Sequence, residues 1–353
     1  MNNLSSKQTV YKQPNPPLVS ICIPVYNSER TIVSTLQSIL NQTYQNLEII
    51  IVDNASTDNT LDLVGKLTDP RIIIYKNSVN IGAEKNFSKC IELATGDYIA
   101  IFHSDDLYKP EMVQKQVQAF QENPSIGAVF TLANQINEQG EVIGEYKLPV
   151  ELKNNGTYCF SEIINLILKK GNFLLCPSAM VRGGLYKELS PFNVEKFGTS
   201  ADLDMWWRIL EKCSITVLNE KLMNYRISKT QGGFSYNYLR TDEADFFKVI
   251  DYHLSTKVHT IKNIPDSALN NYELHRYADN VTRAVNYINE GQTQNAKKLL
   301  KQSISTEIFK AALNQIEKPE YMAFLPFGVM LLVSTYIGLG QYICKMFVRL
   351  RYK

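Results

Sequence analysis

Hydrophobic and polar positions alternate in blocks along residues 18–133. The short apolar runs are rich in β-branched residues and indicate buried strands, at 18–25, 47–52, 71–75 and 98–102. Between them, apolar residues recur on one helical face and predict helices from Ser28 to Leu40, at 58–67 and at 83–94. We therefore expect an α/β fold, with a mostly parallel sheet of the nucleotide-binding kind flanked by helices.

The pattern changes after about residue 126. A strand is predicted at 126–133, and the following Asn137-Glu138-Gln139-Gly140 is typical of a hairpin turn. Further on, the sequence predicts a helix at 159–170, a short strand at 178–181 and a helix at 202–212. This part would complete the second half of the nucleotide-binding fold.

Residues 237–318 carry almost only helix signals. The stretches 273–289 and 293–304 flank Gly291 and predict a helical hairpin with glycine at its turn. The patterns divide the chain into four segments: a polar, flexible N-terminal arm (1–17), the α/β domain (18–236), a C-terminal helical region (237–320) and an apolar tail (321–353).

Composition excludes several classes of protein. The net charge is only +2, which gives no sign of a nucleic-acid partner. The six cysteines form no CxxC pair, and several lie in apolar runs, as expected of reduced cysteines in a cytosolic protein. No GxGxxG follows the first strand and no GxxxxGK[ST] occurs, which argues against a dinucleotide dehydrogenase and a P-loop kinase. A nucleotidyltransferase would need a basic, glycine-rich phosphate loop near the first strand, and none is seen.

Polar clusters follow each of the first four predicted strands. They begin at Pro24, Asp53, Asn80 and His103. Carboxyl ends of parallel strands meet at one sheet edge, where ligands bind, so these clusters should line one crevice. The last one contains Asp105-Asp106, two carboxylates that repel each other unless a cation lies between them. Oxygen ligands suit Mg²⁺ or Mn²⁺, although Asp106 also has the simpler role of capping the next helix.

Five of these segments together resemble the family 2 glycosyltransferases, which have the glycosyltransferase A fold. The segments are 19–27, 52–58, 80–82, 94–99 and 104–106. The resemblance covers about residues 18–235, so that 18–236 is expected to be a glycosyltransferase A-type catalytic domain. It implies an inverting transferase that takes a sugar from a nucleotide-diphosphate sugar, most consistent with UDP, in polysaccharide or glycolipid assembly. It also implies a divalent metal, Mn²⁺ or Mg²⁺.

The resemblance also implies roles for single residues. Asp53 would accept the imide N–H of uracil, or instead cap the following helix, and Tyr26 would pack on the base or fill the core. Asp105, with help from Asp106, would hold the metal. The other residues expected to contact the substrate are Pro24, Asn27, Asn80, Gly82, His103, Ser104 and Arg226. His103 stands where the family commonly has aspartate; an imidazole there would favour Mn²⁺ slightly over Mg²⁺, or would only pack at the loop.

The catalytic base is expected at Asp202. The segment from Gly198 to Arg208 resembles the family segment that carries the base, with Ala201 in place of the usual glutamate. Asp204 is the reserve candidate, and a capping role for Asp202 is the simpler alternative. Ser228 also departs from the family, which often has histidine there. These departures keep a second hypothesis open, a catalytically degenerate scaffold that binds nucleotide sugars.

The tail predicts a contact with a membrane. Residues 321–344 carry no charged side chain, yet polar residues recur along one helical stripe, at Ser334, Gly338, Gln341, Lys345 and Arg349. This pattern favours a helix that lies in the interface, and the positive-inside rule keeps the basic end in the cytoplasm. We expect a cytoplasmic protein, peripheral at the inner face of the membrane, with a carbohydrate or lipid-linked acceptor. The alternative is a helix that packs on the protein itself.

Overall fold

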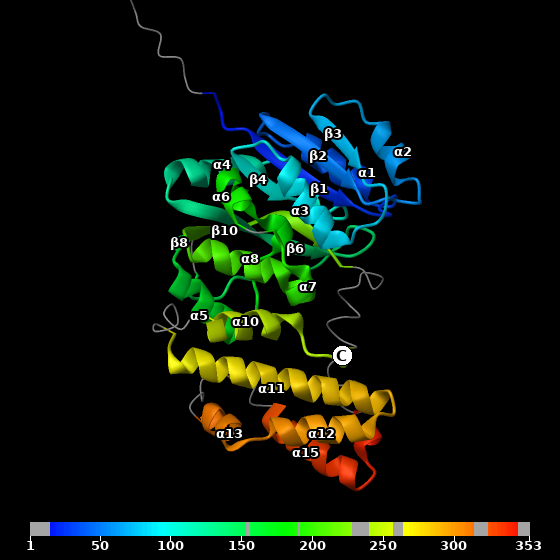
Figure 1. Cartoon of the computed structure of the whole chain (residues 1–353), viewed down its shortest axis with the longest axis vertical. Coiled ribbons are helices and arrows are strands. Elements are labelled where there is room, and N and C mark those ends of the chain that lie inside the picture. The colour runs from blue at the N-terminus through cyan, green and yellow to red at the C-terminus, as the bar shows by residue number, and fades with distance from the viewer. Residues whose placement is uncertain are drawn as a thin grey trace, which may run out of the picture.

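The structure is a computed structural model that describes residues 15–152, 156–189, 191–227, 240–256, 264–313 and 324–344. Within these residues one ten-stranded sheet has the order β3-β2-β1-β4-β9-β6-β10-β5, with β7 paired to β6 and β8 to β10 (Figure 1). The strands are β1 (Val19–Val25), β2 (Leu47–Asp53), β3 (Ile72–Lys76), β4 (Tyr98–Ile101), β5 (Leu107–Tyr108), β6 (Ile126–Ile136), β7 (Val142–Glu145), β8 (Gly156–Tyr158), β9 (Met180–Arg182) and β10 (Ser214–Arg226).

The first half of the sheet is parallel, as the sequence predicts. β1 pairs in parallel with both β2 and β4, and β2 with β3. In register, Val25 at the end of β1 faces Asp53 at the end of β2, so the loops after these strands start side by side. The connecting helices are α1 (Ile32–Leu40), α2 (Thr60–Gly65), α3 (Ala83–Leu93) and, after β5, α4 (Met112–Glu122).

The second half of the sheet adds antiparallel pairings that the sequence pattern did not show. β9 runs antiparallel to both β4 and β6, and lies between them. The predicted turn at Asn137 is confirmed: it joins β6 to the antiparallel β7, and Gly140, with φ of 85°, donates its N–H to the Asn137 carbonyl over 3.0 Å. The helices here are α5 (Phe160–Lys170), α6 (Gly183–Glu188), α7 (Val194–Phe197) and α8 (Ala201–Leu210), with 3₁₀ turns η1 (Cys176–Ser178) and η2 (Gly198–Ser200).

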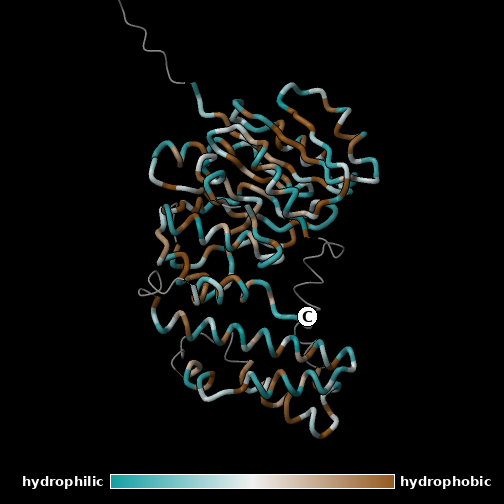
Figure 2. The backbone as a smooth tube through the Cα atoms, viewed as in Figure 1, coloured by the Kyte–Doolittle hydropathy of each residue, from teal (hydrophilic) through white to brown (hydrophobic). Residues whose placement is uncertain are grey.

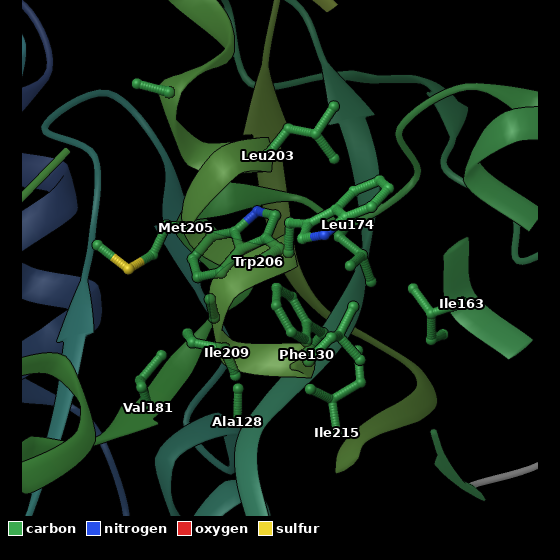
Figure 3. Packing of buried hydrophobic residues seen from close by; sticks show 14 of the residues in the cluster. Ala128, Phe130, Ile163, Leu174, Val181, Leu203, Met205, Trp206, Ile209 and Ile215 are labelled. Atoms are coloured by element: carbon green, nitrogen blue, oxygen red, sulfur yellow. The ribbon is translucent and has the colours of Figure 1, made fainter. Parts of the chain in front are cut away.

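Helix α8 is held against the sheet by a large apolar core (Figure 3). Trp206 is buried and meets Phe130 of β6 edge-on, with ring centroids 5.0 Å apart. On the other side of α8, Trp207 stacks on His253 of α10 (Asp245–Thr256) at 4.6 Å. Such aromatic contacts contribute about 0.5–1.5 kcal/mol each beyond the burial of area. They fix the orientation of α8, whose first turn carries Asp202 and Asp204.

Helix α10 completes the core of the α/β domain although it lies beyond residue 236. Phe247 and Ile250 of α10, with Tyr272 of α11 (Asp266–Asn289), belong to the same apolar cluster as Trp206. The predicted boundary at residue 236 falls within 228–239, outside the described residues. By its packing, the start of the helical region is therefore continuous with the α/β core.

The C-terminal helices form a bundle on the side of α11 away from the sheet (Figure 1). They are α12 (Thr293–Ser303), α13 (Thr306–Leu313) and α15 (Phe324–Tyr336). The predicted helical hairpin is confirmed: α11 packs against α12, and Gly291 between them adopts φ of 79°. α15 packs on both α11 and α12.

The tail helix adopts the alternative that the sequence left open. α15 packs on the bundle, with Leu331 and Ser334 buried, so Ser334 does not lie on a solvated polar stripe. Lys345 and Arg349, the basic end of the expected stripe, lie outside the described residues. It ends at Tyr336, and Gly338 follows with φ of 78°. Gly328 permits the close packing, because an added Cβ would lie 2.2 Å from the Tyr277 hydroxyl of α11. None of the helices in the described ranges is both long and apolar enough to cross a bilayer.

Candidate active site

A cleft of about 820 Å³ opens at the carboxyl ends of β1 and β4. Of the predicted site residues, the structure brings seven together on its walls: Pro24, Tyr26, Asn27, His103, Ser104, Asp105 and Arg226. The β6–β7 turn closes one side through Glu138 and Gln139, which sequence reasoning missed because only the tertiary fold carries this turn back to β1. Arg30, from the β1–α1 loop, adds a further positive charge that was not predicted.

The loop after β1 is tied to the loop after β2. Asn27 has a φ of 48°, and its side-chain oxygen accepts the Thr57 N–H over 2.8 Å. The Asn27 N–H donates in turn to the Ser56 hydroxyl over 3.0 Å. The neighbouring Tyr26 is 48% exposed, so its ring is available to stack on a planar ligand rather than filling the core.

Asp53 lies beneath the surface of the cleft and does not line it. It is fully buried, and its carboxylate accepts the Ser56 N–H over 3.1 and 3.3 Å. Its observed contact is thus the local, loop-capping one, and it is not among the residues that line the cleft. Recognition of a base by Asp53 stays a prediction.

Asn80 and Gly82 also lie away from the cleft lining. Both are exposed and lie at the edge of a network of buried amide side chains, Asn54, Asn77 and Asn86, that the sequence analysis did not foresee. Asn54 donates to the Asn80 side chain over 2.8 Å, and Asn77 donates to Asn54 and Asn86 over 3.1 and 2.8 Å. The network joins the ends of β2 and β3 to α3. The contribution of Asn80 and Gly82 to substrate binding stays a prediction. The observed role of the network is to hold the start of α3.

His103, Asp105 and Asp106 form a cluster that fits a divalent cation. One ligand atom from each lies within 4.8 Å of the others. His103 Nε2 and Asp106 Oδ2 are buried without a hydrogen-bond partner among the described residues. Burial lowers the pKa of His103, which favours the neutral imidazole, and burial together with Asp105 raises the pKa of Asp106 well above its usual range. A bound cation would compensate this cost, because it favours ionised carboxylates.

Arg226 makes hydrogen bonds that hold this cluster in place. Its backbone N–H donates to Asp106 Oδ1 over 2.8 Å, and its Nε donates to the Asp105 carbonyl over the same distance. One terminal nitrogen donates to the carbonyls of Asn137 and Glu138, at 2.9 and 3.0 Å. Arg226 therefore fixes two segments, the loop that carries Asp105 and Asp106 and the β6–β7 turn. It also lines the cleft. The segment that begins with Ser228 lies outside the described residues.

Two carboxylates in the first turn of α8 have different surroundings. Asp204 is buried and engaged on both oxygens, by Arg208 at 2.9 Å and by His253 at 2.8 Å. Asp202 is half-buried and accepts the Leu203 N–H over 2.7 Å. Burial raises its pKa from 3.8 to about 6, against the lowering effect of backbone N–H groups and of the Trp206 side chain. Asp202 has the properties of a proton acceptor, and Asp204 those of a structural ion-pair partner.

Asp202 is not among the residues that line the cleft. The thiol of Cys176 in η1 lies within electrostatic reach of both Asp202 and Asp106. Its pKa is raised well above the usual range, first by burial and then by the charges of Asp202 and Asp106. Cys176 was missed in the sequence because nothing near it in the chain marks it as a neighbour of these aspartates.

Comparison with known proteins identifies the family. The sequence model for Glycosyl transferase family 2 matches residues 20–189. An uncharacterized glycosyltransferase of Methanocaldococcus jannaschii is 30% identical over 253 residues, which cover 70% of this chain and 83% of that protein. An Escherichia coli UDP-Glc:α-D-GlcNAc-diphosphoundecaprenol β-1,3-glucosyltransferase is 35% identical over 213 residues, or 60% of this chain and 77% of that protein. The chain belongs to glycosyltransferase family 2.

Solved structures agree with the fold. The crystal structure of Staphylococcus aureus TarS matches with a TM-score of 0.57 at 16% identity, covering 93% of this chain and 55% of that one. Residues 1–349 of TarS in complex with UDP-GlcNAc match with a TM-score of 0.51 at 17% identity, covering 80% of this chain and 90% of that one. This glycosyltransferase thus has the glycosyltransferase A fold expected from its sequence. The matched family segment includes His103, Asp105 and Asp106 but ends before Asp202.

Proposed function

We propose that this family 2 glycosyltransferase moves a sugar from a nucleotide-diphosphate sugar, linked to UDP, to an acceptor hydroxyl with inversion at the anomeric carbon. The E. coli relative at 35% identity is named for a UDP-glucose donor, which supports a UDP-linked donor here. The exposed ring of Tyr26 and the polar cleft between β1 and β4 suit a nucleotide.

The cofactor in this proposal is a divalent cation, Mn²⁺ or Mg²⁺. Asp105 and Asp106 would hold it, with His103 as a further ligand that favours Mn²⁺. When bound, the cation would supply positive charge to stabilise the leaving diphosphate. One observation supports this assignment: His103 Nε2 and Asp106 Oδ2 are buried without a hydrogen-bond partner among the described residues.

The observation that carries the mechanism is the difference between Asp202 and Asp204. Asp202 has a pKa of about 6 and no cation on its carboxylate among the described residues, so at neutral pH it is mostly ionised and able to accept a proton. In the proposed step the acceptor hydroxyl gives its proton to Asp202 as its oxygen bonds to the anomeric carbon. The bond from that carbon to the diphosphate oxygen breaks, and the electron pair leaves with the diphosphate. Attack from the opposite face inverts the configuration.

The acceptor in this proposal is lipid-linked and the enzyme works at the cytoplasmic side of a membrane. Two E. coli relatives are named for acceptors on diphosphoundecaprenol. The side of α15 and the following turn that points away from the bundle is apolar, and we name it the tail face. It consists of Val333, Tyr336, Ile337, Leu339 and Tyr342, each more than half exposed. Lys297 lies 4.6 Å from the Tyr336 ring, so basic and apolar groups meet at this surface, as in proteins that bind anionic bilayers.

Thermal shift and donor hydrolysis test the proposal. UDP-glucose, UDP-N-acetylglucosamine and GDP-mannose are compared with and without Mn²⁺. A UDP-sugar should raise the melting temperature only when Mn²⁺ is present, and should be slowly hydrolysed. Binding without any turnover, to water or to an acceptor, would favour the degenerate scaffold instead. Stabilisation by no nucleotide sugar would overturn both.

A further inference from the structure

A second cavity of about 840 Å³ lies beside the active cleft. One wall is a stripe of α3, from Lys85 through Lys89 to Glu92, and the other is formed by residues of 186–189 and 191–195. We call this cavity the α3 groove. Phe87 lines the cleft and Phe192 lines the α3 groove, and their rings meet edge-on with centroids 6.2 Å apart. One aromatic pair therefore separates the two spaces.

The α3 groove differs chemically from the cleft. Its apolar lining is formed by Ile81, Ile91, Leu189, Pro191, Phe192 and Val194. Three lysines also line it, Lys85, Lys89 and Lys187, against two acidic residues, Glu92 and Glu195. None of the three lysines has an ion-pair partner among the side chains that the structure describes. Apolar walls with unpaired ammonium groups fit a ligand that has a hydrocarbon chain next to an anionic group.

The α3 groove is also connected to the chemistry through the chain. Its wall at Asn193–Glu195 runs through α7 and η2 directly into α8, where Asp202 is the second residue. A molecule in the α3 groove thus lies against the segment that positions the proposed base, and next to the aromatic wall of the donor cleft. An acceptor must be held close to the reaction centre, and a ligand in the α3 groove would meet this requirement.

We propose that the α3 groove binds the diphosphate and the first isoprenoid units of a lipid-linked acceptor, with Lys89 and Lys187 on the phosphates. The proposal rests on the proposed function, since it gives the acceptor of that reaction a site. It assigns a substrate-binding role to lysines that lie outside the donor cleft.

The test uses farnesyl diphosphate as a probe, with UDP and Mn²⁺ at saturation so that the donor cleft is filled. Binding is measured by calorimetry on the full chain. Two control probes are compared: farnesol, which lacks the diphosphate, and inorganic pyrophosphate, which lacks the hydrocarbon chain. Farnesyl diphosphate should bind about tenfold or more tightly than either, because only it uses both the apolar walls and the lysines.

A double variant and a control assign the site. Lys89→Ala combined with Lys187→Ala should weaken farnesyl diphosphate binding by about tenfold, since two charge-assisted contacts are lost. Lys66→Ala, which removes an exposed lysine that lines neither cavity, should change nothing. UDP binding should be the same in all three proteins.

The outcomes separate this inference from the proposed function. If UDP binds normally but farnesyl diphosphate binds no better than pyrophosphate, or is unaffected by the double variant, the α3 groove is not the acceptor site and the proposed function stands. If UDP does not bind to the parent protein, the proposed function fails and this inference fails with it.

Discussion

Two aspartates in one helical turn show how residue environment separates chemistry from structure. Asp202 and Asp204 are both acidic residues at the start of α8. Asp204 is held by Arg208 and His253, which fix the position of its carboxylate. Asp202 lacks such cations, and burial raises its pKa to about 6. The same residue type thus serves packing at one position and proton transfer, in our proposal, at the other.

The first prediction concerns the base. Asp202→Asn is close to isosteric but accepts no proton at neutral pH, so sugar transfer should fall by at least ~10²-fold while donor binding remains. In the parent enzyme kcat/KM should rise with pH and reach half its maximum near pH 6, since only the ionised carboxylate of Asp202 acts as base and its pKa is about 6. A pH profile of transfer measures this directly.

The control for this prediction is Asp204→Asn. It breaks a buried ion pair with Arg208 and should lower the melting temperature, whereas Asp202→Asn should not. If Asp204→Asn folds and is inactive while Asp202→Asn is active, the two roles must be exchanged.

A second prediction concerns the metal cluster. Asp105→Ala should abolish turnover and remove the Mn²⁺-dependent part of UDP binding, because the cluster loses a carboxylate that would hold the cation. Titration of Mn²⁺ in the presence of UDP measures this loss. His103→Asp, in contrast, should keep activity and shift the metal preference from Mn²⁺ toward Mg²⁺. Transfer by Asp105→Ala at the parental rate would show that the metal assignment is wrong.

Whole elements are positioned by contacts that single residues do not reveal. Helix α15 approaches α11 closely because Gly328 has no side chain, and the Tyr277 hydroxyl of α11 donates to the Leu325 carbonyl over 3.3 Å. The buried face of α15 is small and mixed, with Ser334 beside Leu331. The position of α15 therefore depends on how closely α15 and α11 fit together where Gly328 meets Tyr277.

The third prediction tests that crossing. Gly328→Ala places a Cβ 2.2 Å from the Tyr277 hydroxyl and 2.8 Å from Val281, so either α15 or Tyr277 must move. We expect destabilisation of about 1–3 kcal/mol, the usual cost of overpacking, despite the gain in helix propensity. Gly184→Ala in α6 is the control, since nothing lies within 4 Å of its added Cβ. Chemical denaturation compares the two, and equal stabilities would contradict the packing of α15.

At the scale of the whole molecule, the sheet and the tail face lie at opposite ends, with α11 between them (Figure 1). Hydrophobic residues are frequent along the chain at the far end, where α15 lies (Figure 2). The helical bundle thus presents an apolar surface away from the catalytic core. This arrangement suits an enzyme that rests on a bilayer while its cleft stays accessible to water-soluble donors.

The fourth prediction tests this surface. The triple variant Ile337→Ser, Leu339→Ser and Tyr342→Ser should weaken binding to vesicles containing phosphatidylglycerol by about a hundredfold, since three exposed apolar side chains no longer enter the bilayer. Co-sedimentation with vesicles measures it. The matched control replaces Val142 and Ile143, two exposed apolar residues of β7, by serine. If all three proteins sediment alike, the tail face does not bind membranes.

The sequence by itself determined the order of the elements from β1 to β4 and the family. The apolar runs of β1, β2 and β4 and the turn at Asn137 are local signals, because burial on both faces and tight turns restrict residue types over a few positions. The apolar run of β3 was recognised as a strand in the same way, although β3 lies at the sheet edge and is largely exposed. The same local spacing placed Asp105 and Asp106 at a strand end. Asp202 was selected through its resemblance to a family segment, since the pattern alone did not separate it from a cap.

Only the tertiary structure decided the relations between distant segments. It inserted β9 antiparallel between β4 and β6, brought the β6–β7 turn to the cleft, and placed Cys176 near the charges of Asp202 and Asp106. It engaged Asp204 with His253, 49 residues away, which leaves Asp202 as the carboxylate suited to a base. It also folded α15 onto the bundle, although the uncharged tail predicted a helix in the interface. The physical reason is common to these cases: burial and electrostatics depend on which surfaces meet, and no local pattern encodes the partner.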